Sequence, residues 1–334
     1  MLPPLIESLG LTDPGVYLCI FLVASMLMLW RLEAMLNHGL EGTALGTLLM
    51  PYCSGLGNVL FVVILTRQGG PAVEALTNNL VNNVTNLTLL LGLPAVLWGL
   101  QVTGGVVGKG KARGKAAAAA TGAQLNRLSL MLTILAVLFF TGATWLLAED
   151  GQLSRTDGFL LIGLFLFWQT FHVVDVLKHN VRQKISFRFM FYVDVAVVIG
   201  CAWFLYESID WLVAWITAQK TGFVSVENLG WLSGWLMVLP NALLALYWGR
   251  KRRADVVYSS QVGDGHICIP LCLGLLAVLT PVAVPPFFMT GLLLILGVVV
   301  AHGAFLLLLG GLPRWAGGVF LATYAWFVWA GLLA

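Results

Sequence analysis

Asparagines recur at helical spacing in one short stretch of the chain. Asn78, Asn82 and Asn86 follow one another every four residues, and Asn79 and Asn83 lie beside them. Residues four apart share one face of an α-helix, so this stretch predicts a helix with an amide-rich face. A carboxamide oxygen can coordinate a cation, and a carboxamide nitrogen can donate a hydrogen bond. The face therefore predicts either a cation or water pathway or a set of hydrogen bonds between helices.

A second polar set lies 182 residues further along the chain. Asp264 and Cys268 correspond in this way to Asn82 and Asn86, and both stretches run into a Leu-rich segment that contains a Gly. Two copies of one segment indicate an internal repeat. In transporters, repeats that enter the membrane from opposite sides build a binding site near the bilayer midplane.

The elements that must position these side chains are membrane spans. The chain of 334 residues is 59% hydrophobic and 10% charged, whereas a soluble domain is about 25% charged. This composition excludes a soluble globular protein, and the formal net charge of +3 gives no reason to expect nucleic acid as a partner. The five cysteines lie in apolar stretches, which indicates packed thiols rather than a disulfide framework. The N-terminus lacks a basic start, so no cleavable signal peptide is expected.

Ten apolar stretches are long enough to cross a bilayer, which takes about 20 residues. The predicted spans cover residues 16–36, 43–66, 75–100, 128–147, 158–177, 187–206, 229–249, 264–283, 286–309 and 315–334. Fifteen of the eighteen Lys and Arg residues fall in alternate loops, and only Arg67, Arg155 and Lys220 fall in the others. By the positive-inside rule the basic loops are cytoplasmic, so both termini are predicted to lie outside.

The same alternation divides the chain into five parts. They are residues 1–102 with spans 1–3 and the first repeat copy (about 51–93), a basic cytoplasmic linker at 103–127, spans 4–6 at 128–206, an external segment at 207–228, and spans 7–10 at 229–334 with the second copy (about 234–275). The linker is rich in Gly, Ala and Lys and is predicted to be a flexible tether beside an anionic leaflet. The external segment is apolar but short and is predicted to be an interfacial helix. The second copy begins five spans after the first. Because five is an odd number, the two copies enter the membrane from opposite sides and form an inverted pair.

The two copies carry short motifs at defined places. The second contains Leu239-Pro240-Asn241, Arg253-Ala254-Asp255-Val256-Val257 and Gly263-Asp264-Gly265, and the first contains Gly57-Asn58 before the asparagine-rich stretch. These motifs resemble the Leu-Pro-Glu, Glu-Ala-Asp-Ile-Ala and Gly-Ser-Asn motifs of the sodium/calcium exchanger (cation/Ca²⁺ antiporter) superfamily. The resemblance implies an all-α fold with ten transmembrane helices, two inverted-topology five-helix repeats, and a central cation site.

Two departures from the family's motifs change the charge of the implied site. Both signature glutamates are replaced by Asn. The resemblance places six side chains around the central cation sites, and only one of the six is acidic: Asn58, Asn82, Asn86, Asn241, Asp264 and Cys268. Ca²⁺ prefers six to eight oxygen ligands, several of them carboxylates. A single aspartate leaves part of a dication's charge uncompensated inside a membrane, so the site is expected to favour Na⁺ or H⁺ over Ca²⁺.

Two further residues are predicted to shape the spans. Pro240 is expected to break its helix beside Asn241 and free carbonyls that could coordinate an ion, with a kink that has no ligand role as the alternative. Gly55 and Gly57 are expected to loosen the first copy in the same way. Asp194 lies within the sixth span and is predicted to pair with a polar group of the fifth.

Two other arrangements could bind a metal. His172, Asp175 and His179 follow helical spacing and could form half of a metal site, but hydrogen bonding at the helix end is favoured. Cys268 and Cys272 share a face with the aspartate, which would suit a soft metal, but the sequence offers no further thiolate partner.

The function expected from these features is transport rather than enzymatic catalysis. The chain is predicted to be a cation antiporter of a bacterial-type inner membrane that works by alternating access. Its expected partners are membrane lipid and a transported monovalent or divalent cation. Charge favours Na⁺, with H⁺ and Ca²⁺ as the alternatives, and no cofactor is expected. The alternative is an exchanger-like fold that has lost its carboxylates and serves as a membrane subunit or a scaffold for a protein partner.

Overall fold

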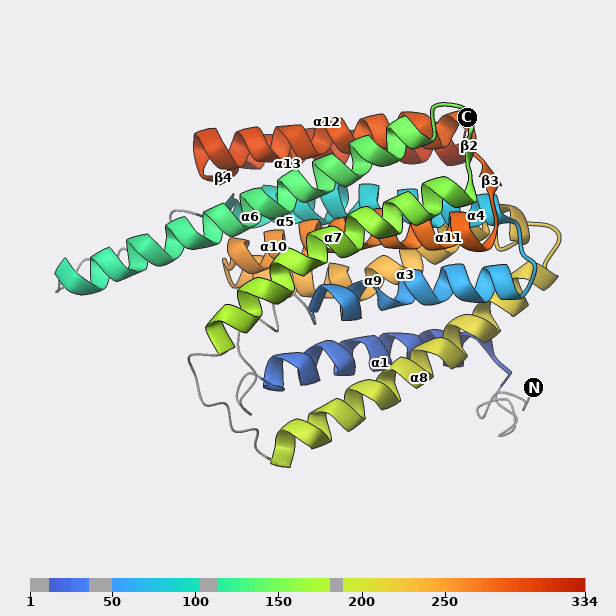
Figure 1. The fold of residues 1–334 in the computed structure, drawn as a ribbon, viewed down its shortest axis with the longest axis horizontal. Coiled ribbons are helices and arrows are strands. Elements are labelled where there is room, and N and C mark those ends of the chain that lie inside the picture. The colour runs from blue at the N-terminus through green and yellow to red at the C-terminus, as the bar shows by residue number, and fades with distance from the viewer. Residues whose placement is uncertain (1–11, 36–49, 103–112, 181–188, 334) are drawn as a thin grey trace.

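The computed structural model describes residues 12–35, 50–102, 113–180 and 189–333 and, within them, all side chains except those of 50–51, 113–126, 172–180 and 333. The helices run along a common direction in one bundle (Figure 1). Eight of the described helical segments are long and apolar enough to cross a membrane, and Tyr52–Arg67 forms a shorter apolar helix. The chain is therefore a multi-pass membrane protein, as its composition predicted.

The elements follow the predicted order of spans. They are α1 (Pro14–Met35), α3 (Met50–Arg67), α4 (Ala72–Val84), η4 (Thr85–Leu89), α5 (Leu90–Trp98), β1 (Leu100–Gln101), α6 (Arg113–Leu147), β2 (Gln152–Leu153), α7 (Arg155–Asn180), α8 (Phe189–Ala218), η5 (Val226–Asn228), α9 (Leu229–Arg250), α10 (Ala254–Ile267), η6 (Cys268–Cys272), α11 (Leu273–Leu279), β3 (Val282–Ala283), α12 (Pro286–Leu309), β4 (Gly311–Leu312), α13 (Arg314–Val328) and η7 (Trp329–Leu333). The short strands β1 and β4 pair antiparallel, and so do β2 and β3.

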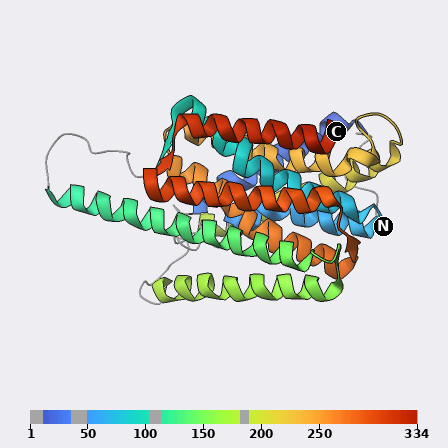
Figure 2. The same ribbon diagram turned by 90° about the horizontal axis from the view of Figure 1, so that it is seen from above.

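Two long helices occupy the middle of the bundle. In the segments α4–η4–α5 and α10–η6–α11, 78% of the most apolar window is buried, and each contains a five-residue π-helical turn, η4 or η6. Around them α4 packs on α9, α5 on α13, α7 on α11 and α6 on α12. Figure 2 shows α6 extending past the ends of its neighbours. The polar face of the central helices is thus turned away from lipid, where its amides would lack partners.

Helices α1 and α8 pack against each other along one edge of the bundle (Figure 1). Arg31 of α1 forms an ion pair with Asp194 of α8 at 3.2 Å. Tyr17 and Trp211 stack with ring centroids 4.0 Å apart. The two helices are therefore joined at two separate places along their length. Asp194 has a partner in the first span, and the partner predicted for it in the fifth span stays a prediction.

The interfacial helix predicted at 207–228 is wrong in its first half. α8 continues without a break to Ala218. The sequence suggested an end there because Glu207 and Asp210 interrupt an apolar run. In the structure Glu207 is buried, and Asp210 is bound by residues at the end of α3. With both acids accommodated, and with neither Gly nor Pro in this stretch, nothing stops the helix.

The flexible linker predicted at 103–127 is also wrong over its second half. α6 begins at Arg113 and includes the run of alanines at 116–120. Alanine has the highest intrinsic helix propensity of all residues, so a low-complexity Ala run next to a span extends that span. Residues 103–112 lie outside the described part of the chain.

Pro240 does not break its helix, contrary to the prediction. α9 runs from Leu229 to Arg250 with Pro240 inside it. Proline removes one helical donor, so the carbonyl of Leu236 loses its usual partner. Close packing on α4 holds α9 in place: a methyl group on Gly234 would lie 2.7 Å from Val81 Cβ. In the two central helices, the local departures from α-helix occur at η4 and η6.

Candidate functional site

Asp264 lies at the centre of the bundle with no exposed surface. Asn82 Nδ2 and Asn86 Nδ2 each donate a hydrogen bond of 2.8 Å to Asp264 Oδ2. Ser54 Oγ lies 3.3 Å from Asp264 Oδ1 and donates to it. The carboxylate of the second repeat copy is therefore held by α3, α4 and η4 of the first copy.

The charge of Asp264 meets only neutral donors among the described residues. The ion pairs of that part of the chain involve other acids: Arg31–Asp194, Arg67–Asp210 and Arg253–Asp255. Transfer of an unpaired carboxylate into an apolar interior costs several kcal/mol, and hydrogen bonds from neutral groups offset only part of that cost. The site is thus suited to receive a positive charge.

Cys268 lies beside this carboxylate on the next turn. Asn58 Nδ2 lies 3.5 Å from Cys268 Sγ, and Asn79 Nδ2 donates to the Cys268 carbonyl at 2.7 Å. Gly55 of α3 faces both side chains, because a methyl group there would lie 3.3 Å from Cys268 Sγ and 3.7 Å from Asp264 Oδ1. The backbone of α3 therefore forms one wall of the site.

Three amide oxygens at this site have no hydrogen-bond partner among the residues that the structure describes. They are Asn58 Oδ1, Asn82 Oδ1 and Asn86 Oδ1, and all three are buried. Buried polar atoms are nearly always paired, so a group of unpaired acceptors needs an explanation. The amide nitrogens of the same residues point to Asp264 and Cys268, which leaves the oxygens free to coordinate a cation.

The π-helical turns carry two residues of the site. Asn86 lies in η4 and Cys268 begins η6. π-Helical turns inside α-helices occur often at functional sites, because the extra residue changes the direction of neighbouring side chains and carbonyls. Pro270 lies within η6 and removes a backbone donor there, a signal that the sequence analysis did not use.

η4 is supported from outside by a buried histidine. His302 Nε2 lies 2.8 Å from the carbonyl oxygen of Leu87, and His302 Nδ1 lies 3.2 Å from Tyr258 Oη. Because a carbonyl oxygen can only accept, Nε2 carries the hydrogen and the Tyr258 hydroxyl donates to Nδ1. This chain connects α12, η4 and α10 around the site.

Asn241 is set slightly apart from the other predicted residues. It lines a small cavity together with Ser54 and Gly57, between the α1–α8 pair and the rest of the bundle. Its carbonyl oxygen lies 3.4 Å from Gln261 Nε2, and its own Nδ2 has no hydrogen-bond partner. Five of the six predicted residues thus form one group. Asn241 is the exception, and it lines the cavity next to this group.

The amides of this face make hydrogen bonds to different partners, and the cation or water pathway stays a prediction. Asn78 donates to Ser233 Oγ of α9 at 3.0 Å, and Asn83 donates to Asn79 within its own helix. These are structural hydrogen bonds. Asn82 and Asn86 face Asp264 instead. Ser54 was not among the predicted site residues, although it precedes Asn58 by four residues and so shares its helix face.

No classical metal centre is present in the described part of the chain. There, no group of three or more His, Cys, Asp and Glu side chains could hold a metal ion. The side chains of His172, Asp175 and His179 lie outside the described set, so the half-site predicted for them stays a prediction. The candidate site is a set of amides around one carboxylate.

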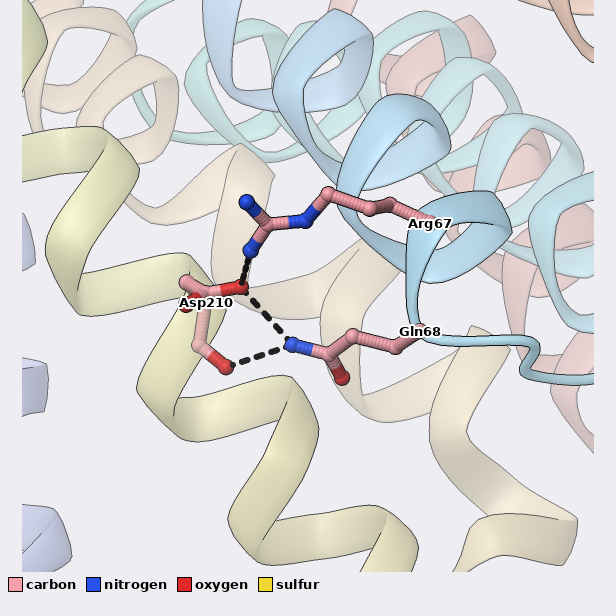
Figure 3. A network of polar contacts seen from close by, with 3 residues as sticks. All are labelled: Arg67, Gln68 and Asp210. Carbon is pink, nitrogen blue, oxygen red and sulfur yellow. Dashed lines mark hydrogen bonds and ion pairs between the residues drawn. The ribbon is translucent and has the colours of Figure 1, made fainter. Parts of the chain in front are cut away.

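A surface network ties α3 to α8 at one end of the bundle (Figure 3). Arg67 forms an ion pair with Asp210 at 2.5 Å. Gln68 Nε2 donates to Asp210 Oδ1 at 2.8 Å and to its carbonyl oxygen at 3.1 Å. The network thus connects the α1–α8 pair to the helix that carries Ser54.

Comparison with known proteins agrees with this geometry. Residues 15–174 match the family model described as sodium/calcium exchanger protein. The fold matches the sodium-calcium exchanger NCX_Mj soaked with 2.5 mM Na⁺ and 1 mM Sr²⁺, at a TM-score of 0.64 and 17% identity over 96% of this chain and 97% of that chain. It also matches NCX_Mj soaked with 100 mM Na⁺ and 10 mM Sr²⁺, at a TM-score of 0.65 and 18% identity over 96% and 98% of the two chains. No curated protein sequence matches the chain significantly.

Proposed function

We propose that this chain is a cation antiporter of the sodium/calcium exchanger superfamily, and that its site favours Na⁺ or H⁺ over Ca²⁺. The observation that carries the proposal is the environment of Asp264. This acid is fully buried, receives hydrogen bonds only from neutral side chains in the described part of the chain, and lies among unpaired amide oxygens.

The charge at the site supports a monovalent ion. One carboxylate compensates one positive charge, and amide oxygens supply the remaining coordination without adding charge. Bound Ca²⁺ would leave the site with a net positive charge. This charge is unfavourable, because unit charges a few ångströms apart in a protein interior interact by several kcal/mol. Na⁺ leaves the site neutral, and a proton on Asp264 does the same.

The pairing of elements supports inverted repeats of five helices. The order α4–η4–α5 followed by β1 recurs as α10–η6–α11 followed by β3. α5 packs on α13 as α11 packs on α7, and β1 pairs with β4 as β3 pairs with β2. These matched relationships are those expected when α1–α7 and α8–α13 are two copies of one unit.

The ends of the helices support the proposed orientation. The turn after α9 and the starts of α6 and α8, which adjoin the basic loops, lie at the same end of the bundle (Figure 1). At that turn, hydrogen bonds donated to Asp255 raise the pKa of Arg253, so this cation stays charged. We assign this end to the cytoplasm of a bacterial-type inner membrane, with both termini outside and ten spans in all.

Alternating access requires a boundary along which the site can open. The small cavity lies between α1 and α8 on one side and α3 and α9 on the other, and Ser54 and Asn241 line it. Because Ser54 also bonds Asp264, this boundary leads directly to the charge. Displacement of the α1–α8 pair along it would expose the site to water.

A scaffold without transport is the competing function, and the site does not favour it. A structural aspartate would be expected to have a cationic partner, and a structural amide would be expected to use its oxygen. Currents from purified protein on a solid-supported membrane test the proposal. We expect transient currents under a Na⁺ or H⁺ gradient and a much weaker response to Ca²⁺ alone. Absence of current under all three gradients would favour the scaffold.

A further inference from the structure

We infer that Cys268 makes the central site a binding site for thiophilic divalent cations of the Zn²⁺ and Cd²⁺ class. The inference concerns the site of the proposed function but stands on a separate feature, the sulfur ligand. It applies to binding, whether or not such an ion is carried across the membrane.

The donor set combines one sulfur with several oxygens. Cys268 has no exposed surface, and its Sγ and Asp264 Oδ1 both lie within 4 Å of the same point above Gly55. The carboxamide of Asn58 faces the thiol through Nδ2, while its buried Oδ1 has no partner. A thiol and a carboxylate therefore converge on one space, and the carboxamide of Asn58 lies next to the thiol.

The sulfur changes the charge balance for one class of ion only. When a thiophilic cation binds, the S–H bond of Cys268 breaks, an S–metal bond forms, and the proton leaves to water. The thiolate and the Asp264 carboxylate then carry two negative charges, which compensate a dication. Ca²⁺ is a hard ion that gains little from sulfur, so for it the site keeps a single useful charge.

The approach to the site is also rich in sulfur. Met28, Cys53 and Met237 line the small cavity that contains Ser54 and Asn241. Thioether and thiol groups are soft ligands that bind Zn²⁺-class and Cu⁺-class ions better than alkali or alkaline-earth ions. The cavity next to the site therefore offers further soft ligands to a thiophilic ion.

Titration of the purified full-length protein with Cd²⁺ tests this inference. Cd²⁺ bound to a thiolate gives an ultraviolet charge-transfer band, which reports the metal–sulfur bond independently of transport. We expect a saturable band at one Cd²⁺ per protein, with Ca²⁺ in excess failing to displace it. Cys201→Ser is the matched control, because Cys201 is a buried cysteine of α8 and is absent from the cavity lining.

The variants separate the outcomes. Cys268→Ser should lose the band, Asp264→Asn should weaken Cd²⁺ binding at least tenfold, and Cys201→Ser should match the parent. Cys268→Ala repeats the test if Cys268→Ser fails to fold. Absence of the band in the parent protein, or its persistence in both Cys268 variants, would overturn the inference. Sodium-driven currents in the same preparation would leave the proposed function intact in that case.

Discussion

Asn82 and Asp264 are 182 residues apart in sequence and are joined by a hydrogen bond of 2.8 Å at the centre of the bundle. They hold corresponding positions in the two proposed repeat copies, so equivalent residues of these copies would meet each other. One copy supplies the amide and the other supplies the charge. A change at either residue should therefore affect the same ion.

Asp264→Asn should abolish cation-dependent current and leave the protein folded. The amide has nearly the same shape and can still accept from Asn82 and Asn86, but it carries no charge. Removal of an unpaired buried charge should leave the melting temperature unchanged or raise it. Currents and thermal unfolding with and without Na⁺ check this. A loss of roughly 3–5 kcal/mol of stability, with no effect of Na⁺ on the parent, would instead indicate a structural ion pair.

Asn82→Ala should weaken apparent cation affinity without abolishing transport. It deletes one neutral ligand worth about 1 kcal/mol, which corresponds to roughly a fivefold change in affinity. Asn78→Ala is the matched control on the same helix face, because Asn78 donates to Ser233 rather than to Asp264. The control should lower stability by about 1 kcal/mol and leave affinity unchanged. Equal affinity losses in both variants would contradict the separation of these roles.

Acid should weaken cation binding competitively. A proton on Asp264 cancels the charge that attracts the cation, so the apparent Na⁺ affinity should fall as pH falls, while saturating Na⁺ restores the current. Na⁺ titrations at several pH values measure this competition. Asp255→Asn should keep the same pH dependence, because Asp255 lies in the first turn of α10, far along the helix from Asp264, and pairs with Arg253. A maximal current that falls with acid at unchanged affinity would place the titrating group elsewhere.

Asp210→Asn should change the rate of exchange more than stability. The Arg67–Asp210 pair is partly exposed, and such pairs contribute about 0–1 kcal/mol. If α8 moves relative to α3 during transport, loss of this ion pair should speed that conformational change by up to about fivefold. Current decay rates for Arg67→Gln, Asp210→Asn and the double variant form the test. Independent, additive effects of the two substitutions would mean that the pair does not act as a tie.

Reporter fusions should place the basic loops on one side of the membrane. Fusions at Lys111, Lys184 and Arg252 should all report a cytoplasmic location, because these loops hold most of the cations. A fusion at Lys220 should report the opposite side. One periplasmic signal among the first three would be incompatible with the inverted repeat.

Spacing predicted part of the arrangement of these side chains, whereas their role in a cation site stays a prediction. The four-residue intervals in α4 and the offset between the copies correctly indicated that Asn82, Asn86 and Asp264 face inward together. Spacing could not show which amides donate to Asp264 and which donate to a neighbouring helix. Asn78 and Asn82 share one helix face and differ only in their tertiary neighbours. It also failed at Pro240, where packing on α4 outweighs the lost hydrogen bond, and at residues 207–218, where Asp210 is bound by Arg67 and Gln68 from another helix.

The missing side chain of Gly55 bears on ion radius. At this wall the site is bounded by helix backbone, which cannot rotate aside as a side chain can. A cation is therefore fitted against a rigid surface at a set distance from the carboxylate. We expect discrimination between ions of equal charge, such as Na⁺ and K⁺, to depend on how closely α3 approaches η6. In this arrangement, Asp264 sets valence and α3 sets size.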